Sequence, residues 1–247
     1  MVALKQCIEK ESKAPDDLIN YDDAIKYWSN IEPSVNGVLG GYGDTTNVPR
    51  VDIVGSLIFY RSVKTKFLNV APKDTNYGMD FGAGIGRVTK NLLSQICDQV
   101  DLLEPVENFV VRMNDELSVL KQKGKIGKIL QISMQNWVPE EPQKYTLLWC
   151  QWCCGHLTDQ DFLKWMDNCR IALKNGGVLI VKENNSTDLH GNDVFDPTDS
   201  SKTRSDLHFK ELFKRAGWKL CMTMKQRGMP RELYPIQMYA LQPITEA

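Results

Sequence analysis

The feature that most constrains the fold is a regular alternation of apolar, strand-like runs and helical patterns from residue 78 onward. The run "YGMDFGAG" leads into a glycine loop, and "IGRVTKNLLSQI" after it has apolar residues at helical spacing. Further strand-like runs, each separated by a helical pattern or a loop, are "VDLLEP", "IGKILQIS", "YTLLWCQW" and "VLIVKEN". Because this alternation builds parallel sheets with helices on both faces, the sequence predicts an α/β domain.

The two ends of the chain depart from the alternation. Near the C-terminus, "KLCMTMKQRG" and "IQMYALQP" predict an antiparallel pair that closes a sheet of about seven strands. Residues 19–70 have helical patterns and no strand, so we interpret them as a helical cap or lid on an α/β domain at residues 71–247, with which they form one compact unit. Residues 1–18 are predicted to be a flexible N-terminus, and the helix "DQDFLKWMDNCRIALKNGG" is predicted to end at residues 175–177.

The turn after the first predicted strand, "DFGAGIGR", carries three glycines. The dinucleotide fingerprint G-x-G-x-x-G requires a third glycine where this chain has Arg87, so that fingerprint fails. Glycines at this place still let the backbone pass close to a ligand, and Glu104, at the end of the next strand, can accept both hydroxyls of a ribose. The alternative is a tight strand–helix turn without a ligand.

Charge and cysteine content argue against nucleic acid or membranes as partners and favour an intracellular protein. The net charge of −1 provides no overall field that attracts nucleic acid or membranes. No apolar run reaches the ~18 residues typical of a membrane-spanning helix. The first residues, "MVALKQCIEKESKAPDD", are too charged for a secretory signal, and the seven irregularly spaced cysteines indicate reduced thiols in the cytoplasm or the nucleus.

The stretch "LLWCQWCCGHLTD" has the composition of a metal site, a redox site, a piece of core or the edge of an active site. Its single C-x-x-C, from Cys150 to Cys153, has no second pair, whereas zinc sites usually draw on two. A thioredoxin-type pair opens a helix, but these cysteines follow a buried strand. We therefore interpret Cys150, Cys153, Cys154 and Trp149 as core residues and predict no metal site.

The pattern Asp80-x-Gly82-x-Gly84-x-Gly86, followed by Glu104, resembles the class I methyltransferases that bind S-adenosylmethionine. More narrowly, "GVLGGYG", "QWCCGHL", "KENN", "DSSKTRSD" and "RELYP" resemble a fungal member of the eukaryotic protein N-terminal methyltransferases, over residues 20–242. Those enzymes methylate the α-amine of proteins that begin Xaa-Pro-Lys after removal of the initiator Met. The resemblance implies a Rossmann-like fold with a mostly parallel sheet and a helical cap. It also implies S-adenosyl-L-methionine as the cofactor and S-adenosyl-L-homocysteine as the product.

The resemblance also implies roles for individual residues. The implied cofactor-binding residues are Trp28, Gly82, Gly84, Arg87, Glu104, Met134, Gln135 and Gln151. The implied peptide-binding residues are Leu39, Trp152, Asn184, Asp196, Ser201 and Tyr234. An indole such as that of Trp152 suits the flat, apolar ring of a substrate proline, while Asp196 with Ser201 holds the third-residue Lys. Asp199 and His156 are the implied bases that take a proton from the α-amine.

The aspartates between residues 188 and 206 fit this reading, because the substrate offers two cations, an α-ammonium and a lysine side chain. The alternative is that these aspartates lie in a solvent-exposed loop without a binding role. Two other functions stay open from the sequence: a small-molecule N-methyltransferase and a non-catalytic S-adenosylmethionine-binding adaptor. The resemblance implies mono-, di- or trimethylation of protein N-termini, ribosomal proteins among them, without nucleic acid, membrane or metal.

Overall fold

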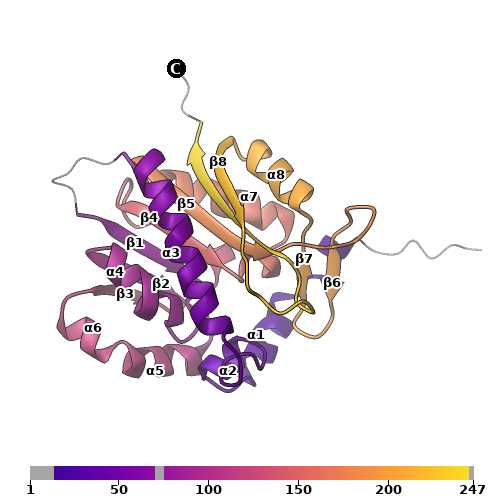
Figure 1. The fold of residues 1–247 in the computed structure, drawn as a ribbon, viewed down its shortest axis with the longest axis horizontal. Helices are drawn as coiled ribbons and strands as arrows, with labels where there is room; N and C mark the ends of the chain where they lie inside the picture. Colours follow the sequence, from indigo (N-terminus) through magenta and orange to yellow (C-terminus); the bar gives the residue numbers. More distant parts are fainter. Residues whose placement is uncertain (1–13, 70–74, 245–247) are drawn as a thin grey trace, which may run out of the picture.

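The computed structural model describes residues 14–69 and 75–244 (Figure 1). Its main sheet has seven strands in the order β3-β2-β1-β4-β5-β9-β8, parallel except for β9, which runs antiparallel to both β5 and β8. This confirms the predicted fold class. The strands are β1 (Tyr77–Phe81), β2 (Gln99–Leu103), β3 (Ile126–Leu130), β4 (Tyr145–Gln151), β5 (Leu173–Asn184), β8 (Trp218–Lys225) and β9 (Ile236–Pro243).

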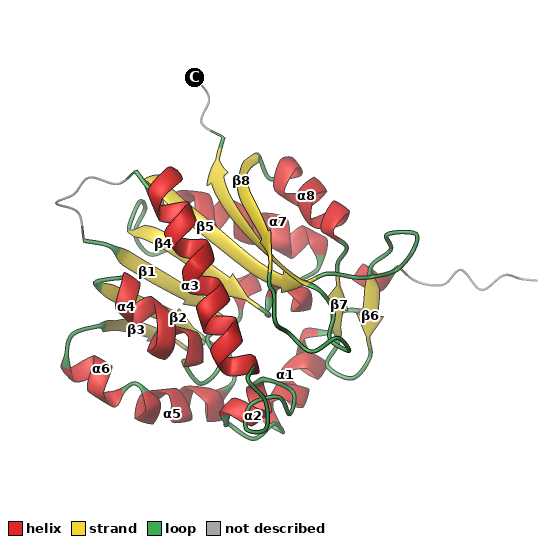
Figure 2. Ribbon diagram, in the orientation of Figure 1, coloured by secondary structure: helices red, strands yellow, loops and turns green. Residues whose placement is uncertain are grey.

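Helices cover both faces of this sheet, as the secondary-structure colours of Figure 2 show. Polar side chains begin several of them: Asn20, Ser34, Thr158 and Ser205 each accept a hydrogen bond from a backbone N–H of the first turn. The α-helices are α1 (Tyr21–Ser29), α2 (Val35–Val38), α3 (Val48–Lys66), α4 (Ser94–Ile96), α5 (Glu107–Glu116), α6 (Ser118–Gln122), α7 (Asp159–Ala172) and α8 (Asp206–Arg215). Shorter turns are η1 (Pro15–Leu18), η2 (Thr89–Leu93), η3 (Met134–Asn136) and η4 (Cys154–His156).

The strands alternate their side chains between two cores. In β5, Leu179 and Val181 face the core that α7 and α8 cover, whereas Val178 and Ile180 face the core beneath α3. Figure 1 shows α3 crossing the sheet in front, with α7 behind it. Long apolar runs in the strands therefore reflect burial on both faces.

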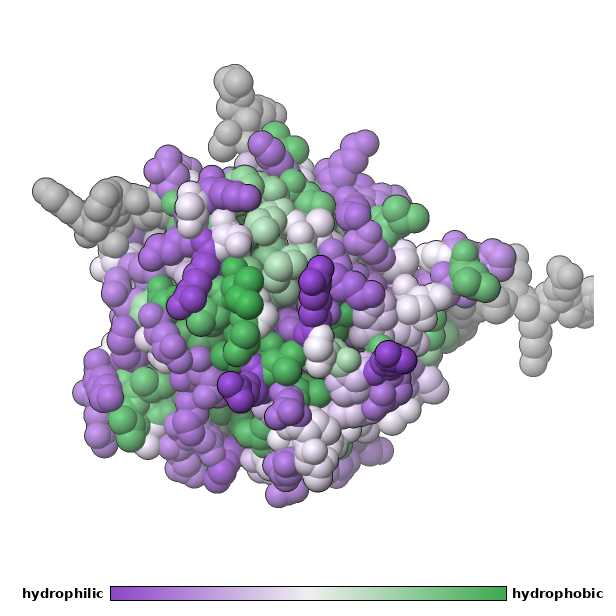
Figure 3. All heavy atoms as spheres, viewed as in Figure 1, coloured by the Kyte–Doolittle hydropathy of each residue, from purple (hydrophilic) through white to green (hydrophobic). Residues whose placement is uncertain are grey.

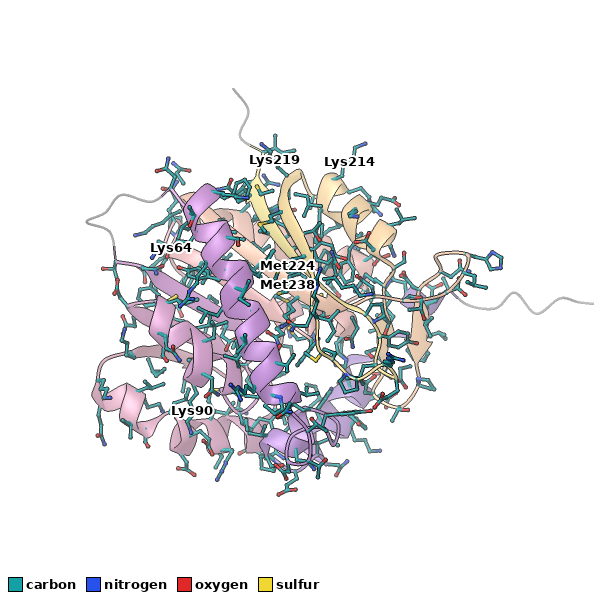
Figure 4. All side chains as sticks on the ribbon, in the orientation of Figure 1. Lys64, Lys90, Lys214, Lys219, Met224 and Met238 are labelled. Carbon is teal, nitrogen blue, oxygen red and sulfur yellow. The ribbon has the colours of Figure 1, made fainter. Side chains whose placement is uncertain are left out.

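The N-terminal helices take two different positions. The segment α3 packs on the sheet, where its core contacts include fully buried Met238 of β9; Met238 pairs with Met224 of β8 (Figure 4). On the outer side of α3, Val54 and Ile58 are exposed, and Figure 3 shows an apolar patch in this region. By contrast, α1, α2 and the hairpin of β6 (Val194–Asp196) and β7 (Ser201–Thr203) lie toward the carboxyl ends of the parallel strands (Figure 1).

The structure differs from the prediction in two boundaries and in one additional hairpin. Helix α7 ends at Ala172 rather than at residues 175–177, because Leu173 is extended (φ −82°, ψ 132°) and pairs with Tyr145. The aspartate-rich loop contains the β6–β7 hairpin, which we had not predicted. Of the segment predicted to be flexible, residues 1–18, the first 13 lie outside the described residues. Pro15–Leu18 forms the 3₁₀ turn η1.

Buried charge holds the hairpin and η1 together. The ammonium of Lys202 in β7 lies 2.7 Å from Asp16 Oδ1 of η1, 2.8 Å from Asp159 Oδ1 of α7 and 3.4 Å from Asp193 Oδ2. Lys202 is only 3% exposed, so these carboxylates replace its water. This cluster fixes the hairpin that carries Asp196 and Asp199. Across the described ranges, no helix is both long and apolar enough to cross a membrane.

Candidate active site

A pocket opens at the carboxyl ends of β1, β2 and β4, which is the usual ligand-binding edge of an open α/β sheet. Helices α1 and α2 contribute Ala24, Ile25 and Val38 to its wall. The wall also includes every residue predicted to bind the cofactor, together with Trp152 and His156: Trp28, Gly82, Gly84, Arg87, Glu104, Met134, Gln135 and Gln151. The structure thus brings these predicted residues together, while their roles stay predictions.

The glycine turn and Glu104 form one side of the pocket. Glu104 is 5% exposed, and its carboxylate accepts hydrogen bonds from the N–H groups of Gly84 (2.8 Å) and Val106 (2.9 Å). Gly82 has φ +61°, and a Cβ there would lie 2.5 Å from the Cβ of Cys153, so only glycine fits this turn. The backbone of the glycine turn therefore lies at the pocket wall beside the buried carboxylate of Glu104, where it can contact a ligand closely.

Burial raises the pKa of Glu104 from its ordinary value of 4.5 to about 7. Ribose hydroxyls that donate to this carboxylate favour its ionised form, so we expect cofactor binding at about pH 6 to release a proton. Calorimetry in two buffers of different ionisation enthalpy measures that release. Equal enthalpies in the two buffers would contradict the prediction. The raised pKa also affects the stability of the cofactor-free protein. Between pH 4.5 and about 7 the Glu104 carboxyl is protonated in the folded state but ionised in the unfolded state. The free energy of unfolding should therefore decrease as the pH rises through this range.

The turn after β4 presents Trp152 to the pocket. Trp152 has φ +56°, which is a strained backbone conformation for a bulky residue. The backbone N–H of Trp152 donates to the Lys182 carbonyl at 3.1 Å. The next two N–H groups, of Cys153 and Cys154, donate to Glu183 Oε1 at 2.7 and 3.0 Å. Two consecutive residues of β5 therefore hold the turn in this conformation.

Cys153 packs against the core but is only partly buried and also lines the pocket, whereas Cys150 and Cys154 are fully buried core residues. Ligand atoms of Cys150, Cys153 and Glu183 lie within 4.8 Å of one another, the one such group of three among the residues that the structure describes. However, burial raises the pKa of the Cys150 and Cys154 thiols, and the Cys153 thiol donates to the Phe81 carbonyl at 3.2 Å. These contacts indicate protonated thiols packed beneath the pocket.

His156 ends the turn η4, two residues before the N-cap Thr158 of α7, and does not belong to that helix. Its Nε2 accepts a hydrogen bond from the Trp28 indole at 3.1 Å and lies 3.9 Å from Asp199 Oδ2. Burial lowers the pKa of His156, although Asp199 opposes this shift. The ring is therefore neutral near pH 7, with Nε2 as the acceptor nitrogen.

The other carboxylate oxygen of Asp199 is held by Ser201, whose N–H and hydroxyl donate to Oδ1 at 3.2 and 2.6 Å. Ser201, predicted to hold a substrate lysine, therefore orients Asp199 here. Asp196 is exposed, pairs with Ser201 across the hairpin and accepts a hydrogen bond from the Thr198 N–H at 2.8 Å. Oδ2 of Asp199 is left facing His156.

The remaining predicted peptide-binding residues do not line the pocket itself. Asn184 ends β5 and pairs with Ile236, which places it at the same end of the sheet as Tyr234. Tyr234 is 38% exposed in the β8–β9 loop, and Leu39 follows α2. The Tyr42 hydroxyl donates to Glu232 at 3.3 Å, so the loop that follows Leu39 contacts the loop that carries Tyr234.

Sequence reasoning missed a buried ionic cluster behind the pocket. Asp52 of α3 and Lys182 of β5 are both 0% exposed and paired, and Asp52 also binds Arg87 and Gln151 of the pocket wall. A signal was present: Lys182 interrupts the apolar run "VLIVKEN", and a charge inside a buried strand requires a partner. The pairing with a residue 130 positions away could not be read from the sequence.

Known proteins are similar to this chain over nearly its whole length. The family described as AdoMet dependent proline di-methyltransferase matches residues 16–242. Alpha N-terminal protein methyltransferase 1 of Schizosaccharomyces pombe is 42% identical over 223 residues, covering 90% of this chain and 96% of that protein. N-terminal Xaa-Pro-Lys N-methyltransferase 1-A of Xenopus laevis is 33% identical over 225 residues, covering 90% and 94%. A solved SAM-dependent methyltransferase of Leishmania major superposes with a TM-score of 0.78 at 36% identity, covering 94% of this chain and 87% of that one.

Proposed function

This chain belongs to the family of AdoMet-dependent proline di-methyltransferases and is an S-adenosylmethionine-dependent N-terminal protein methyltransferase, and from this premise we propose that its substrates begin Xaa-Pro-Lys. The α-amine of the first residue is the methyl acceptor. The observation that carries the proposal is the approach of Asp199 Oδ2 to His156 Nε2, at 3.9 Å, where His156 and Trp152 line the pocket. A proton acceptor and an aromatic surface thus lie beside the cofactor-binding edge.

The pocket residues fit S-adenosylmethionine chemically. Glu104 offers its carboxylate to the ribose hydroxyls, and the Arg87 guanidinium suits the carboxylate of the cofactor's amino-acid end. Gly82 and Gly84 allow close approach of the backbone, and Met134 and Gln135 of η3, which line the pocket, would hold the adenine. When bound, the cofactor supplies an electrophilic sulfonium methyl group.

The protein's own residues prepare the acceptor amine. An α-ammonium has a pKa of about 7.7–8.0, so near neutral pH a modest base is sufficient to remove its proton. Asp199 Oδ2 is the available acceptor, because Trp28 occupies His156 Nε2. His156 can take the proton only after that hydrogen bond breaks. Orienting the free amine in line with the methyl group then supplies much of the acceleration.

Peptide recognition follows from charge and shape. The Trp152 indole packs against the substrate's proline, and Asn184 with Tyr234 binds the peptide backbone. Asp196, exposed on the hairpin with its carboxylate near a β-turn, attracts the third-residue lysine with Ser201 beside it. Leu39 completes the opposite wall. Ribosomal proteins with this N-terminus are candidate substrates in the cytoplasm and nucleus, where free thiols such as those of Cys150 and Cys154 persist.

Mass spectrometry of synthetic peptides tests the function. We expect Ala-Pro-Lys peptides to gain up to three methyl groups in the presence of cofactor, and Pro-Pro-Lys peptides to stop at two, because proline has a secondary amine. An N-acetylated peptide is the matched control and should gain none. An Ala-Pro-Glu peptide should react far more slowly, because Asp196 and Asp199 repel its third side chain. Methylation of the acetylated peptide would show that the enzyme modifies another group.

A further inference from the structure

The buried cluster behind the pocket is organised around one carboxylate. Asp52 Oδ2 accepts from Arg87 Nη1 at 2.7 Å, and Asp52 Oδ1 accepts from Gln151 Nε2 at 2.9 Å. The ammonium of Lys182 binds Asp52 Oδ1 as well, and it donates to Ser56 and Gln226 at 2.9 Å each. Both Arg87 and Gln151 line the pocket, so Asp52 connects α3 to the ligand site through two hydrogen-bonded side chains.

The charges in this cluster do not cancel. Burial alone would raise the pKa of Asp52, but Lys182 and Arg87 outweigh it, so the pKa is lowered and the carboxylate is ionised. Lys182 and Arg87 contribute two positive charges against this single negative one. The next carboxyl that feels Arg87 is Asp80, whose pKa burial raises to about 7. Asp52 therefore offsets one of the two buried cations, and Asp80 offsets the other only when it is ionised.

The two ligands of the proposed reaction differ by one charge at sulfur. S-adenosylmethionine has a sulfonium, whereas S-adenosylhomocysteine has a neutral thioether with the same carboxylate and amine. The carboxylate and the ammonium are common to both ligands, so their interactions with the cluster cancel in a comparison of the two. The sulfonium belongs to the cofactor alone, and a positive charge nearby repels it. Every positive charge left unbalanced in the cluster therefore favours the product over the cofactor.

We propose that Asp52 is a positioning residue that holds Arg87, Gln151 and Lys182 in place and, by offsetting one of the two buried cations, limits the preference of the pocket for product over cofactor. This inference rests on the proposed function. The inference goes beyond the proposed function because it assigns a role to a residue of α3 that does not line the pocket. Asp52 then affects product inhibition as well as affinity.

Asp52 also acts on Trp152 through the two cations that it binds. The Arg87 guanidinium carbon and the Lys182 ammonium lie 5.6 and 5.7 Å from the centroid of the Trp152 ring. Both cations attract the face of the indole, and both are held by Asp52. Releasing them changes the surface on which the substrate's proline rests.

Calorimetric titration of S-adenosylmethionine and S-adenosylhomocysteine into wild type, Asp52→Asn and Lys182→Met tests the proposal. At about pH 8.5 the carboxyls of Asp80 and Glu104, whose pKa values are about 7, keep a constant charge. Burial lowers the pKa of Lys182 and Asp52 opposes this shift, so Asp52→Asn favours a neutral Lys182 and leaves the Arg87 guanidinium as the uncompensated cation. The ratio of cofactor Kd to product Kd should then rise by on the order of tenfold for one uncompensated charge. Lys182→Met removes one cation, so the ratio should fall.

Asp101→Asn is the matched control. Asp101 is likewise 0% exposed and paired with a lysine, Lys144, at 2.8 Å, but neither it nor Lys144 lines the pocket. Its removal should lower the unfolding temperature and leave the ratio unchanged. A ratio that stays constant in both test variants, or moves in the same direction in both, would overturn the proposal. Wild type that binds neither ligand would instead refute the proposed function.

Discussion

Asp199→Asn is expected to lower the maximal rate on an Xaa-Pro-Lys peptide by roughly 10²-fold or more, with cofactor affinity close to that of wild type. The amide keeps the shape and can still accept from Ser201, whose hydroxyl lies 2.6 Å from Asp199 Oδ1. It loses the basic oxygen that faces His156 at 3.9 Å. Rapid-quench or mass-spectrometric rates at saturating peptide, with calorimetry of the cofactor, separate the two quantities.

His156→Ala distinguishes the two candidate bases. If Asp199 alone takes the proton, His156→Ala should slow the reaction less than Asp199→Asn does, because the ring's Nε2 is already occupied by Trp28. Ser201→Ala is the matched control for the hairpin, since it removes a contact to Asp199 and leaves its charge. An Asp199→Asn enzyme that turns over the peptide at the wild-type rate would assign the proton transfer to His156.

Glu104→Ala is expected to weaken cofactor binding by about 10²-fold or more, because hydrogen bonds to a charged group contribute about 1.5–3 kcal/mol each. The variant loses the acceptor for two ribose hydroxyls and leaves the N–H groups of Gly84 and Val106 without their partner. Calorimetric titration with S-adenosylmethionine measures the loss. The substitution should also remove the proton release that accompanies binding.

Glu183→Gln provides the control for a buried carboxylate near the same pocket. Glu183 is also buried, but it holds the turn of Trp152 through Cys153 and Cys154, so its loss should affect peptide binding more than cofactor binding. Thermal unfolding of both variants checks that each is folded. Unchanged cofactor affinity in Glu104→Ala would remove Glu104 from the ribose site.

The sequence predicted the sheet because strand and helix periods are local properties. The runs at "YGMDFGAG" and "YTLLWCQW" became β1 and β4, and "IQMYALQP" became the antiparallel β9. The end of α7 was misplaced because glycines at 176 and 177 indicate a helix stop, whereas pairing of Leu173 with Tyr145 begins the strand earlier. Tertiary pairing decided that boundary.

The candidate site was predictable where residues follow strand ends. Glu104 and Gln151 could be placed because parallel strands end at one edge of the sheet. The contact between Trp28 and His156 joins residues 128 positions apart, and the pairing of Asp52 with Lys182 joins residues 130 apart, so neither follows from any local pattern. The position of the hairpin depends on the ionic contacts of Lys202 with Asp16 and Asp159.

The close packing of Gly82 against Cys153 has a consequence for protein engineering. A Cβ at position 82 would lie 2.5 Å from the Cys153 side chain, so the turn after β1 and the turn after β4 fit into each other. Rebuilding residues 152–154 to accept a new peptide will therefore move the glycine turn as well. Libraries that randomise the two turns together should yield altered specificity more readily than libraries that vary either one alone.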